Sequence, residues 1–314
     1  MTLQKLTATE LPESIYHGPL YAEHLSGSEL WAYIDSCPAE YVYGEKKETK
    51  SLVTGSAVHS EVLEMHSFDE LYYRGFEPTE ETTFTSDAAV KAQLKKIGIA
   101  GYSSKSGQDL YDMLLKAEPD AVIKNVEEAK LAEVNEGKTL LSYKDYDMAK
   151  AMREQLMQYP NYAEYVTQGE CESSIVGECV LFDRKVLVKT RPDIIYGNSI
   201  TNYKTAASAK PADLIRQCFN NGYFMKEVFN AMVFEWLYGY FPEINIMAQS
   251  KKAPYVCTMF SMTQEMIDVG MAQLQQAFDL WVQCKDAGVV VDYAQGEILT
   301  NLELEPWMIS KAVN

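Results

Sequence analysis

The spacing of apolar residues near the amino terminus predicts two helices. Apolar residues over 30–34 follow Ser26 and Glu29, which stand three positions apart as in a helical capping box. This pattern predicts a helix that ends near Pro38, because proline cannot continue a helix. Residues 51–65 again place their apolar side chains on one helical face. His59 is therefore predicted to lie on a helix.

The pattern changes from a helical to an alternating period after residue 170. Residues 172–182, 184–197 and 199–205 are rich in β-branched residues, and the turn sequences FDR and GNS separate them. These three segments predict three consecutive antiparallel strands.

The carboxyl-terminal part returns to helices with a pair of strands between them. Residues 211–241 read as one long helix with a weak point at Asn221 and Gly222. Two strands are expected within residues 243–262, and a helix opened by Thr263 follows them. The order of helices, β-meander, helix, strands and helix predicts an α+β fold with a mixed sheet.

Residues 67–150 fit this core less well. Residues 67–85 are polar, and residues 86–150 read as short amphipathic helices broken by glycine-rich and proline-containing stretches. A further helix, within residues 145–166, is expected to stop at Pro160. We predict a single domain over residues 1–314 with a helical insertion or arm around residues 67–150.

Composition and charge narrow the class of protein. With 314 residues, 47% hydrophobic and 23% charged, the chain predicts a globular protein with a substantial core. Neither a membrane-spanning run nor a signal peptide is recognisable, which predicts a cytoplasmic protein. The six cysteines include no CxxC pair, so we expect reduced thiols rather than a zinc ribbon or a disulfide framework. The net charge of −17 argues weakly against a nucleic-acid partner but does not exclude one, because carboxylates away from the DNA path also count toward it.

The predicted hairpin contains a candidate metal site. Asp193 follows Pro192 near the end of one strand, and Asn202 and Lys204 on the next strand share a face because they are two residues apart. Hard divalent cations bind oxygen ligands, and a nearby lysine can hold a nucleophile and stabilise developing charge. The arrangement suits phosphodiester hydrolysis, although Asn202 is an amide where a carboxylate is expected. The pattern is weakly specific on its own.

Five segments of the chain, in order, give this pattern a context. Together they resemble exodeoxyribonuclease VIII (the RecE type) and related phage and prophage proteins, within the PD-(D/E)XK nucleases. The likeness spans most of residues 20–285 and is weakest between 67 and 150. The segments are LSGSELWAYIDSCPAEYVYG, TGSAVHSEVLE, TRPDIIYGNSITNYKTA, NNGYFMKEVFNAMV and MAQSKKAPYVCTMF.

The resemblance implies a restriction-endonuclease-like core with a mixed central sheet flanked by helices. It also implies a Mg²⁺- or Mn²⁺-dependent exonuclease that degrades linear double-stranded DNA 5′ to 3′. The resulting 3′ single strand would serve recombination through an annealing protein, and the nuclease would form a homo-oligomeric ring around the duplex. Position by position, His59 would lie beside the metals, Asp193 would bind metal, Asn202 would occupy the second acidic position and Lys204 would be the catalytic lysine. Glu172 would be a further acidic neighbour of the metals.

Three departures from the family pattern raise an alternative. Asn202 replaces the acidic ligand, Lys226 stands where the family has glutamine, and Ser250 stands where the family often has glutamate. An amide oxygen can bind Mg²⁺ but brings no negative charge. The alternative hypothesis is therefore a catalytically inert nuclease-fold phage protein that binds DNA or a host protein in a regulatory or anti-defence role.

Two groups of lysines could contact phosphates. Lys46, Lys47 and Lys50 form one group, and Lys251 and Lys252 form the other. Solvated loops are the alternative interpretation for both groups.

Overall fold

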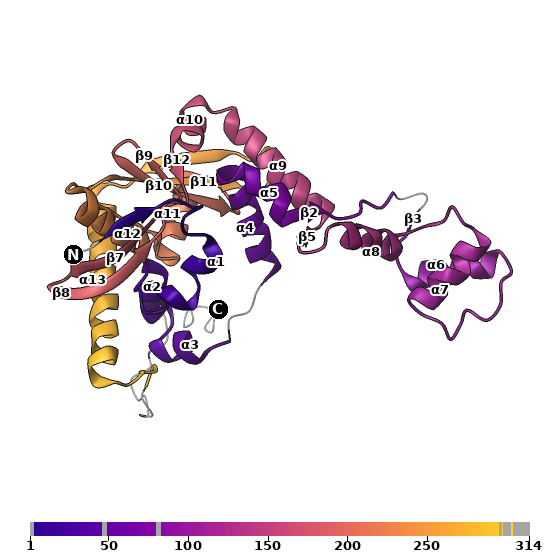
Figure 1. The fold of residues 1–314 in the computed structure, drawn as a ribbon, viewed down its shortest axis with the longest axis horizontal. Coiled ribbons are helices and arrows are strands. Elements are labelled where there is room, and N and C mark those ends of the chain that lie inside the picture. Colours follow the sequence, from indigo (N-terminus) through magenta and orange to yellow (C-terminus); the bar gives the residue numbers. More distant parts are fainter. Residues whose placement is uncertain (1–2, 46–48, 80–82, 295–296, 298–302, 304–314) are drawn as a thin grey trace, which may run out of the picture.

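The computed structural model describes residues 3–45, 49–79, 83–294, 297 and 303. Figure 1 shows a body built around β-sheets with helices on either side, and an arm that projects from it. Near the amino terminus, strand β1 (Gln4–Leu6) pairs antiparallel with β7 (Ser174–Leu181).

A five-stranded mixed sheet forms the centre of the body, in the order β12-β11-β10-β9-β6. Its central pair, β10 and β11, is parallel, and its other neighbours are antiparallel. This sheet confirms the predicted α+β fold. Its strands are β6 (Glu170–Cys171), β9 (Ile194–Tyr196), β10 (Ser199–Ala206), β11 (Glu243–Ser250) and β12 (Cys257–Ser261).

A second, three-stranded antiparallel sheet corrects the prediction of a simple three-stranded meander. The order is β1-β7-β8, with β1 at Gln4–Leu6, β7 at Ser174–Leu181 and β8 at Arg184–Thr190. The predicted second strand is thus split between the two sheets, as β8 and β9, whereas the predicted first strand corresponds to β7 alone and the short strand β6 precedes it. The chain passes between the sheets at Glu172, whose φ is +55°, and at residues 191–193, where Pro192 has no backbone N–H for a ladder.

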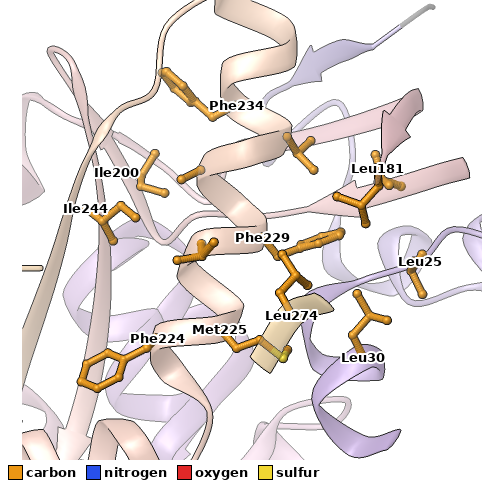
Figure 2. Close-up of a cluster of buried hydrophobic side chains, with 14 of the residues drawn as sticks. Leu25, Leu30, Leu181, Ile200, Phe224, Met225, Phe229, Phe234, Ile244 and Leu274 are labelled. Atoms are coloured by element: carbon orange, nitrogen blue, oxygen red, sulfur yellow. The ribbon is translucent and has the colours of Figure 1, made fainter. Parts of the chain in front are cut away.

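Helices cover both faces of the five-stranded sheet, and each face has its own core. On one face, side chains of β10 and β11 such as Ile200 and Ile244 pack against Phe229 and Leu274 (Figure 2). On the other face, Tyr203 and Met247 of the same two strands pack against helices α4 and α9. Alternation along each strand thus assigns neighbouring residues to opposite cores. The body helices are α1 (Glu13–Tyr16), α2 (Gly27–Asp35), α3 (Pro38–Tyr43), α4 (Lys50–Leu63), α5 (Met65–Leu71), α9 (Tyr143–Met157), α10 (Pro160–Gln168), α11 (Pro211–Asn220), α12 (Tyr223–Tyr238) and α13 (Gln264–Ala287), with the 3-10 helix η1 at Pro19–Tyr21.

Local sequence signals account for several of these helix boundaries. The Ser26 hydroxyl accepts a hydrogen bond from the Glu29 backbone N–H, and Thr263 caps α13 through the Met266 N–H in the same way. The predicted long helix is two helices, because Gly222 takes a left-handed conformation with φ of +64° between α11 and α12. A Cβ there would lie 2.1 Å from the Trp31 ring, so only glycine fits this break.

The arm comprises the described residues between strands β2 (Tyr72–Arg74) and β5 (Thr139–Leu141), which pair in parallel at its base. Helices α6 and α7 lie at its far end (Figure 1). Six buried side chains, including Leu94, Leu110 and Leu114, form a small hydrophobic cluster within it. The arm elements are β3 (Thr83–Phe84), α6 (Asp87–Lys96), α7 (Gln108–Ala117), β4 (Val122–Ile123) and α8 (Lys124–Val134).

Candidate active site

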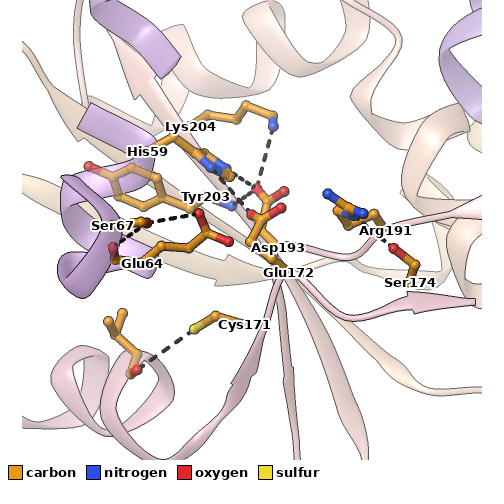
Figure 3. Close-up of polar contacts among 11 residues, drawn as sticks. His59, Glu64, Ser67, Cys171, Glu172, Ser174, Arg191, Asp193, Tyr203 and Lys204 are labelled. Carbon is orange, nitrogen blue, oxygen red and sulfur yellow. Dashed lines mark hydrogen bonds and ion pairs between the residues drawn. The ribbon is translucent and has the colours of Figure 1, made fainter. Parts of the chain in front are cut away.

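Helix α4 presents His59 to the edge between the two sheets. Thr49 caps the helix by accepting the Leu52 N–H, and buried Val58 and Val62 fix its rotation against the sheet. His59 then points toward Glu172 and Asp193 (Figure 3). Its Nδ1 lies 3.3 Å from Glu172 Oε1, and its Nε2 lies 3.2 Å from Asp193 Oδ2.

The break between the sheets brings the two acidic residues together. The Glu172 backbone N–H donates to the Asp193 carbonyl at 3.1 Å. This hydrogen bond joins the bend at Glu172 to the bend at residues 191–193. The left-handed conformation of Glu172 costs about 1–2 kcal/mol for a residue with a side chain. Such outliers gather at functional sites, so the bend by which the chain passes from β6 to β7 marks the candidate site.

Strand β10 adds Lys204 to this group. The Asp193 carboxylate accepts the Tyr203 backbone N–H at 2.7 Å, and the Lys204 Nζ lies 3.5 Å from the same Asp193 oxygen (Figure 3). Asp193 therefore contacts the histidine, the lysine and the backbone of β10. The structure thus brings together His59, Glu172, Asp193 and Lys204, four of the five residues that the sequence analysis nominated.

Burial and charge shift the pKa of each group. Burial alone would raise the pKa of Asp193, but Lys204 and His59 outweigh it and hold that pKa at about 2. Burial raises the pKa of Glu172 to about 8, although His59 opposes the shift. For both His59 and Lys204 burial lowers the pKa, but the neighbouring carboxylates more than offset it, so both pKa values are raised. Lys204 is therefore protonated at neutral pH.

The donor set of this cluster fits a divalent cation. One ligand atom each from His59, Glu172 and Asp193 lies within 4.8 Å of the others. Among the described residues, the buried Oε1 atom of Glu172 has no hydrogen-bond partner, and it lies 3.3 Å from His59 Nδ1, another ligand atom of the same set. The two carboxylates are the kind of oxygen ligand that Mg²⁺ and Mn²⁺ prefer, and His59 adds an imidazole beside them.

A cavity of about 1670 Å³ opens onto the cluster. Its wall includes His59, Glu172, Asp193 and Lys204, together with the basic Arg191. The Arg191 Nε donates a hydrogen bond to the Ser174 hydroxyl at 2.8 Å (Figure 3). The guanidinium of Arg191 also lies 4.3 Å from the centre of the Tyr16 ring. Arg191 is thus held as a fixed positive charge in the cavity wall. The sequence analysis did not nominate it, although it directly precedes the Pro-Asp pair.

Asn202 has a different environment from the other nominated residues. It is buried and is not among the residues that line the cavity. Its Nδ2 donates to Glu227 on α12, while its Oδ1 has no hydrogen-bond partner within the described part of the chain. Burial, together with the negative charge of Asp193, raises the pKa of Glu227 to about 7, although Lys204 opposes the shift. Glu227 was missed because α12 reads as a core helix; a charged residue between the apolar Met225 and Val228 was the available signal.

The remaining departures lie around the same strand. The Lys226 Nζ donates to the Asn221 carbonyl at 2.9 Å and lies over the Trp31 and Tyr223 rings. Burial and the nearby Lys204 lower the pKa of Lys226 to about 8. Ser250 is buried at the end of β11.

The nominated lysines separate into different environments. Lys251 lines the cavity, whereas Lys50 is exposed and lies 3.2 Å from Asp145. Lys46 and Lys47 lie outside the described residues. The prediction that these lysines contact phosphates stays a prediction.

Comparison with known proteins assigns the family. Residues 30–296 match the PDDEXK-like domain of unknown function, DUF3799. The chain therefore belongs to this PDDEXK-like family. The result confirms the expected nuclease-like core but does not single out the RecE type within it.

One solved structure agrees with this chain in its fold. A protein from Eubacterium rectale, named as a candidate exonuclease, is 13% identical with a TM-score of 0.53, over 96% of this chain and 98% of that one. A second structure, SSO0001, is also 13% identical and covers 73% of this chain and 85% of its own, but its TM-score of 0.25 carries no argument. The comparison with the curated proteins gives no match. Within the described residues, no helix has both the length and the hydropathy of a membrane span.

Proposed function

We propose that this PDDEXK-like protein is a Mg²⁺- or Mn²⁺-dependent nuclease that degrades linear double-stranded DNA from its ends. The observation that carries the proposal is the convergence of His59, Glu172, Asp193 and Lys204 on one cavity wall, at the bend between the two sheets. The family assignment supports a nuclease-type function for this cluster.

The chemistry divides among these residues by their charge. Asp193, Glu172 and His59 would hold the metal, because they supply two carboxylates and an imidazole within 4.8 Å of one another. A divalent cation supplies positive charge to a phosphate and lowers the pKa of a bound water. Lys204, protonated beside Asp193, would orient the attacking water and stabilise the charge that develops on the phosphate. Arg191 and Lys251 add positive charge to the cavity wall that the DNA backbone would approach.

The finer features of the proposal follow from the resemblance to the RecE type. They are 5′ to 3′ polarity, a 3′ single-stranded product handed to an annealing protein for recombination, and a homo-oligomeric ring around the duplex. The net charge of −17 makes a local basic wall necessary for any DNA path. Polarity is measured with duplexes labelled at either the 5′ or the 3′ end, and the ring by the mass of the protein in solution.

One observation favours a second candidate function. Asn202 lacks a carboxylate, and its amide nitrogen donates to Glu227. A nuclease fold without cleavage would bind DNA or a host protein in a regulatory or anti-defence role.

The deciding experiment is digestion of end-labelled linear duplex DNA with Mg²⁺ or Mn²⁺, with a closed circular duplex as the control substrate. We expect the unaltered chain to degrade the linear duplex, and Asp193→Asn to abolish this. If only Asn202→Asp degrades DNA, Asn202 is a disabling change in a nuclease centre. If neither chain cuts, the inert binding protein is the better interpretation.

A further inference from the structure

Glu227 is a buried acid that the proposed mechanism does not use. Only 1% of its surface is exposed, and among the described residues no cation lies within ion-pair distance of it. Its two oxygens accept hydrogen bonds from two amides, Asn202 Nδ2 and, at 3.1 Å, Asn230 Nδ2. The Asn230 oxygen in turn accepts the hydroxyl of Thr190. These residues thus form a series of polar contacts inside the otherwise apolar interface between α12 and the sheets.

This arrangement is costly unless the charge has a use. A carboxylate removed from water loses several kcal/mol of solvation, which hydrogen bonds from neutral amides restore only in part. The neighbours of Glu227 along α12, Met225 and Val228, are fully buried apolar residues of the core. An apolar residue at position 227 would therefore stabilise a protein that needed only this packing.

The hydrogen bond from Asn202 fixes the direction of its amide. The Asn202 Nδ2 donates to Glu227 Oε1, so the NH₂ group of Asn202 faces Glu227. Among the described residues, the buried Oδ1 atom on the other side of the amide has no hydrogen-bond partner. Asn202 shares a strand face with Lys204, two residues along β10, and the Lys204 Nζ lies 3.5 Å from Asp193, so strand alternation places this oxygen on the face that carries the lysine of the cluster.

We propose that Glu227 is a positioning residue that supplies, through the amide of Asn202, the negative charge missing from position 202. The carboxylate holds the NH₂ group and polarises the amide, so that Oδ1 becomes a stronger oxygen ligand for the cation held by Asp193 and Glu172. The expected strand carboxylate is thereby replaced by an amide on β10 and a carboxylate on α12. This inference rests on the proposed nuclease function.

The test compares Mn²⁺ affinity, measured by calorimetry, with cleavage of linear duplex DNA. Glu227→Gln keeps the size and an acceptor oxygen for Asn202 but removes the charge. We expect it to weaken Mn²⁺ binding about 10- to 100-fold, as loss of a partner to a metal ligand typically does. In the double variant Asn202→Asp with Glu227→Gln, the charge returns to the strand, and most of the affinity should return with it.

A matched control separates this role from a structural one. Glu61 is a second buried glutamate, 3% exposed and 2.9 Å from Lys150, outside the cluster and the cavity wall. Glu61→Gln should lower the unfolding temperature without changing Mn²⁺ affinity. Rescue by the double variant is the result that a purely structural Glu227 would not give.

The outcomes distinguish this inference from the function beneath it. If the unaltered chain binds Mn²⁺ and cleaves DNA, and Glu227→Gln does both equally well, the inference is overturned and the nuclease function stands. If Asn202→Asp alone binds more tightly than the unaltered chain while Glu227→Gln has no effect, Asn202 is a disabling change and the inference is again overturned. If no variant binds Mn²⁺ or cleaves, both fall.

Discussion

The body and the arm of this protein are stabilised in different ways. In the body, the candidate site depends on strands and helices far apart in the sequence: His59 from α4, Glu172 and Asp193 from the sheet break, and Lys204 from β10. The arm, by contrast, is held by a cluster of side chains from residues 84–126 alone, within the described part of the chain. The candidate site thus depends on contacts between distant parts of the chain, whereas the arm cluster depends on contacts within the arm itself.

The largest expected effect falls on Lys204, the lysine to which we assign a catalytic role. Lys204→Ala removes the positive charge beside Asp193 and should lower the rate of DNA cleavage by about 10²- to 10⁴-fold, the usual contribution of a positioned catalytic group. Lys116→Ala on the exposed surface of α7 is the matched control in the arm and should leave the rate unchanged. If both variants lost cleavage activity equally, the idea that catalysis depends on the body and not on the arm would be wrong.

A substitution that creates a cavity in the body core should destabilise the whole protein. Phe229 is fully buried between α12 and the sheets (Figure 2), so Phe229→Ala should lower the free energy of unfolding by about 3–5 kcal/mol. Phe219 is 50% exposed, and Phe219→Ala provides the control, expected within about 0.5 kcal/mol. Urea denaturation measures both; a small effect at Phe229 would contradict the assignment of this core.

A substitution that creates a cavity in the arm core should destabilise the arm alone. Leu114 is fully buried, and Leu114→Ala should cost the arm cluster about 2–5 kcal/mol. Hydrogen exchange should quicken over α6 and α7 while β10 and α12 keep their protection. Faster exchange in β10 would show that body and arm unfold as one unit.

The smallest expected effect is a pH-dependent one at Lys226. Its pKa is lowered from 10.5 to about 8 in the folded protein, so the folded state binds fewer protons than the unfolded state between these values. The unfavourable contribution of Lys226 to the free energy of folding is therefore largest below pH 8. It decreases as the pH rises from 8 to 10.5. Lys226→Met should raise the unfolding temperature at pH 7 more than at pH 9.5. A gain that is the same at both pH values would exclude the charge as its cause.

The sequence predicted features set by neighbouring residues better than features set by contacts between distant residues. Capping by Ser26 and Thr263 and the helical face of Val58 and Val62 were predicted from neighbouring residues, and the structure confirms them. The break at Gly222 was visible only as a weak point, because the Trp31 ring that demands glycine lies almost two hundred residues away. The division of the strands between two sheets was not predicted, since β-propensity does not say which strand a segment pairs with.

The sequence by itself determined the α+β order of elements, the helix carrying His59, and a hairpin with Asp193 and Lys204 near one another, because helical and strand periods are local properties. It also supplied the resemblance that named the nuclease fold. Only the tertiary structure decided that Glu172 bends toward His59 and Asp193, that Arg191 faces the same cavity, and that Asn202 is paired with Glu227. These contacts join residues that are distant in the chain, and which of them form depends on how the sheets and helices pack.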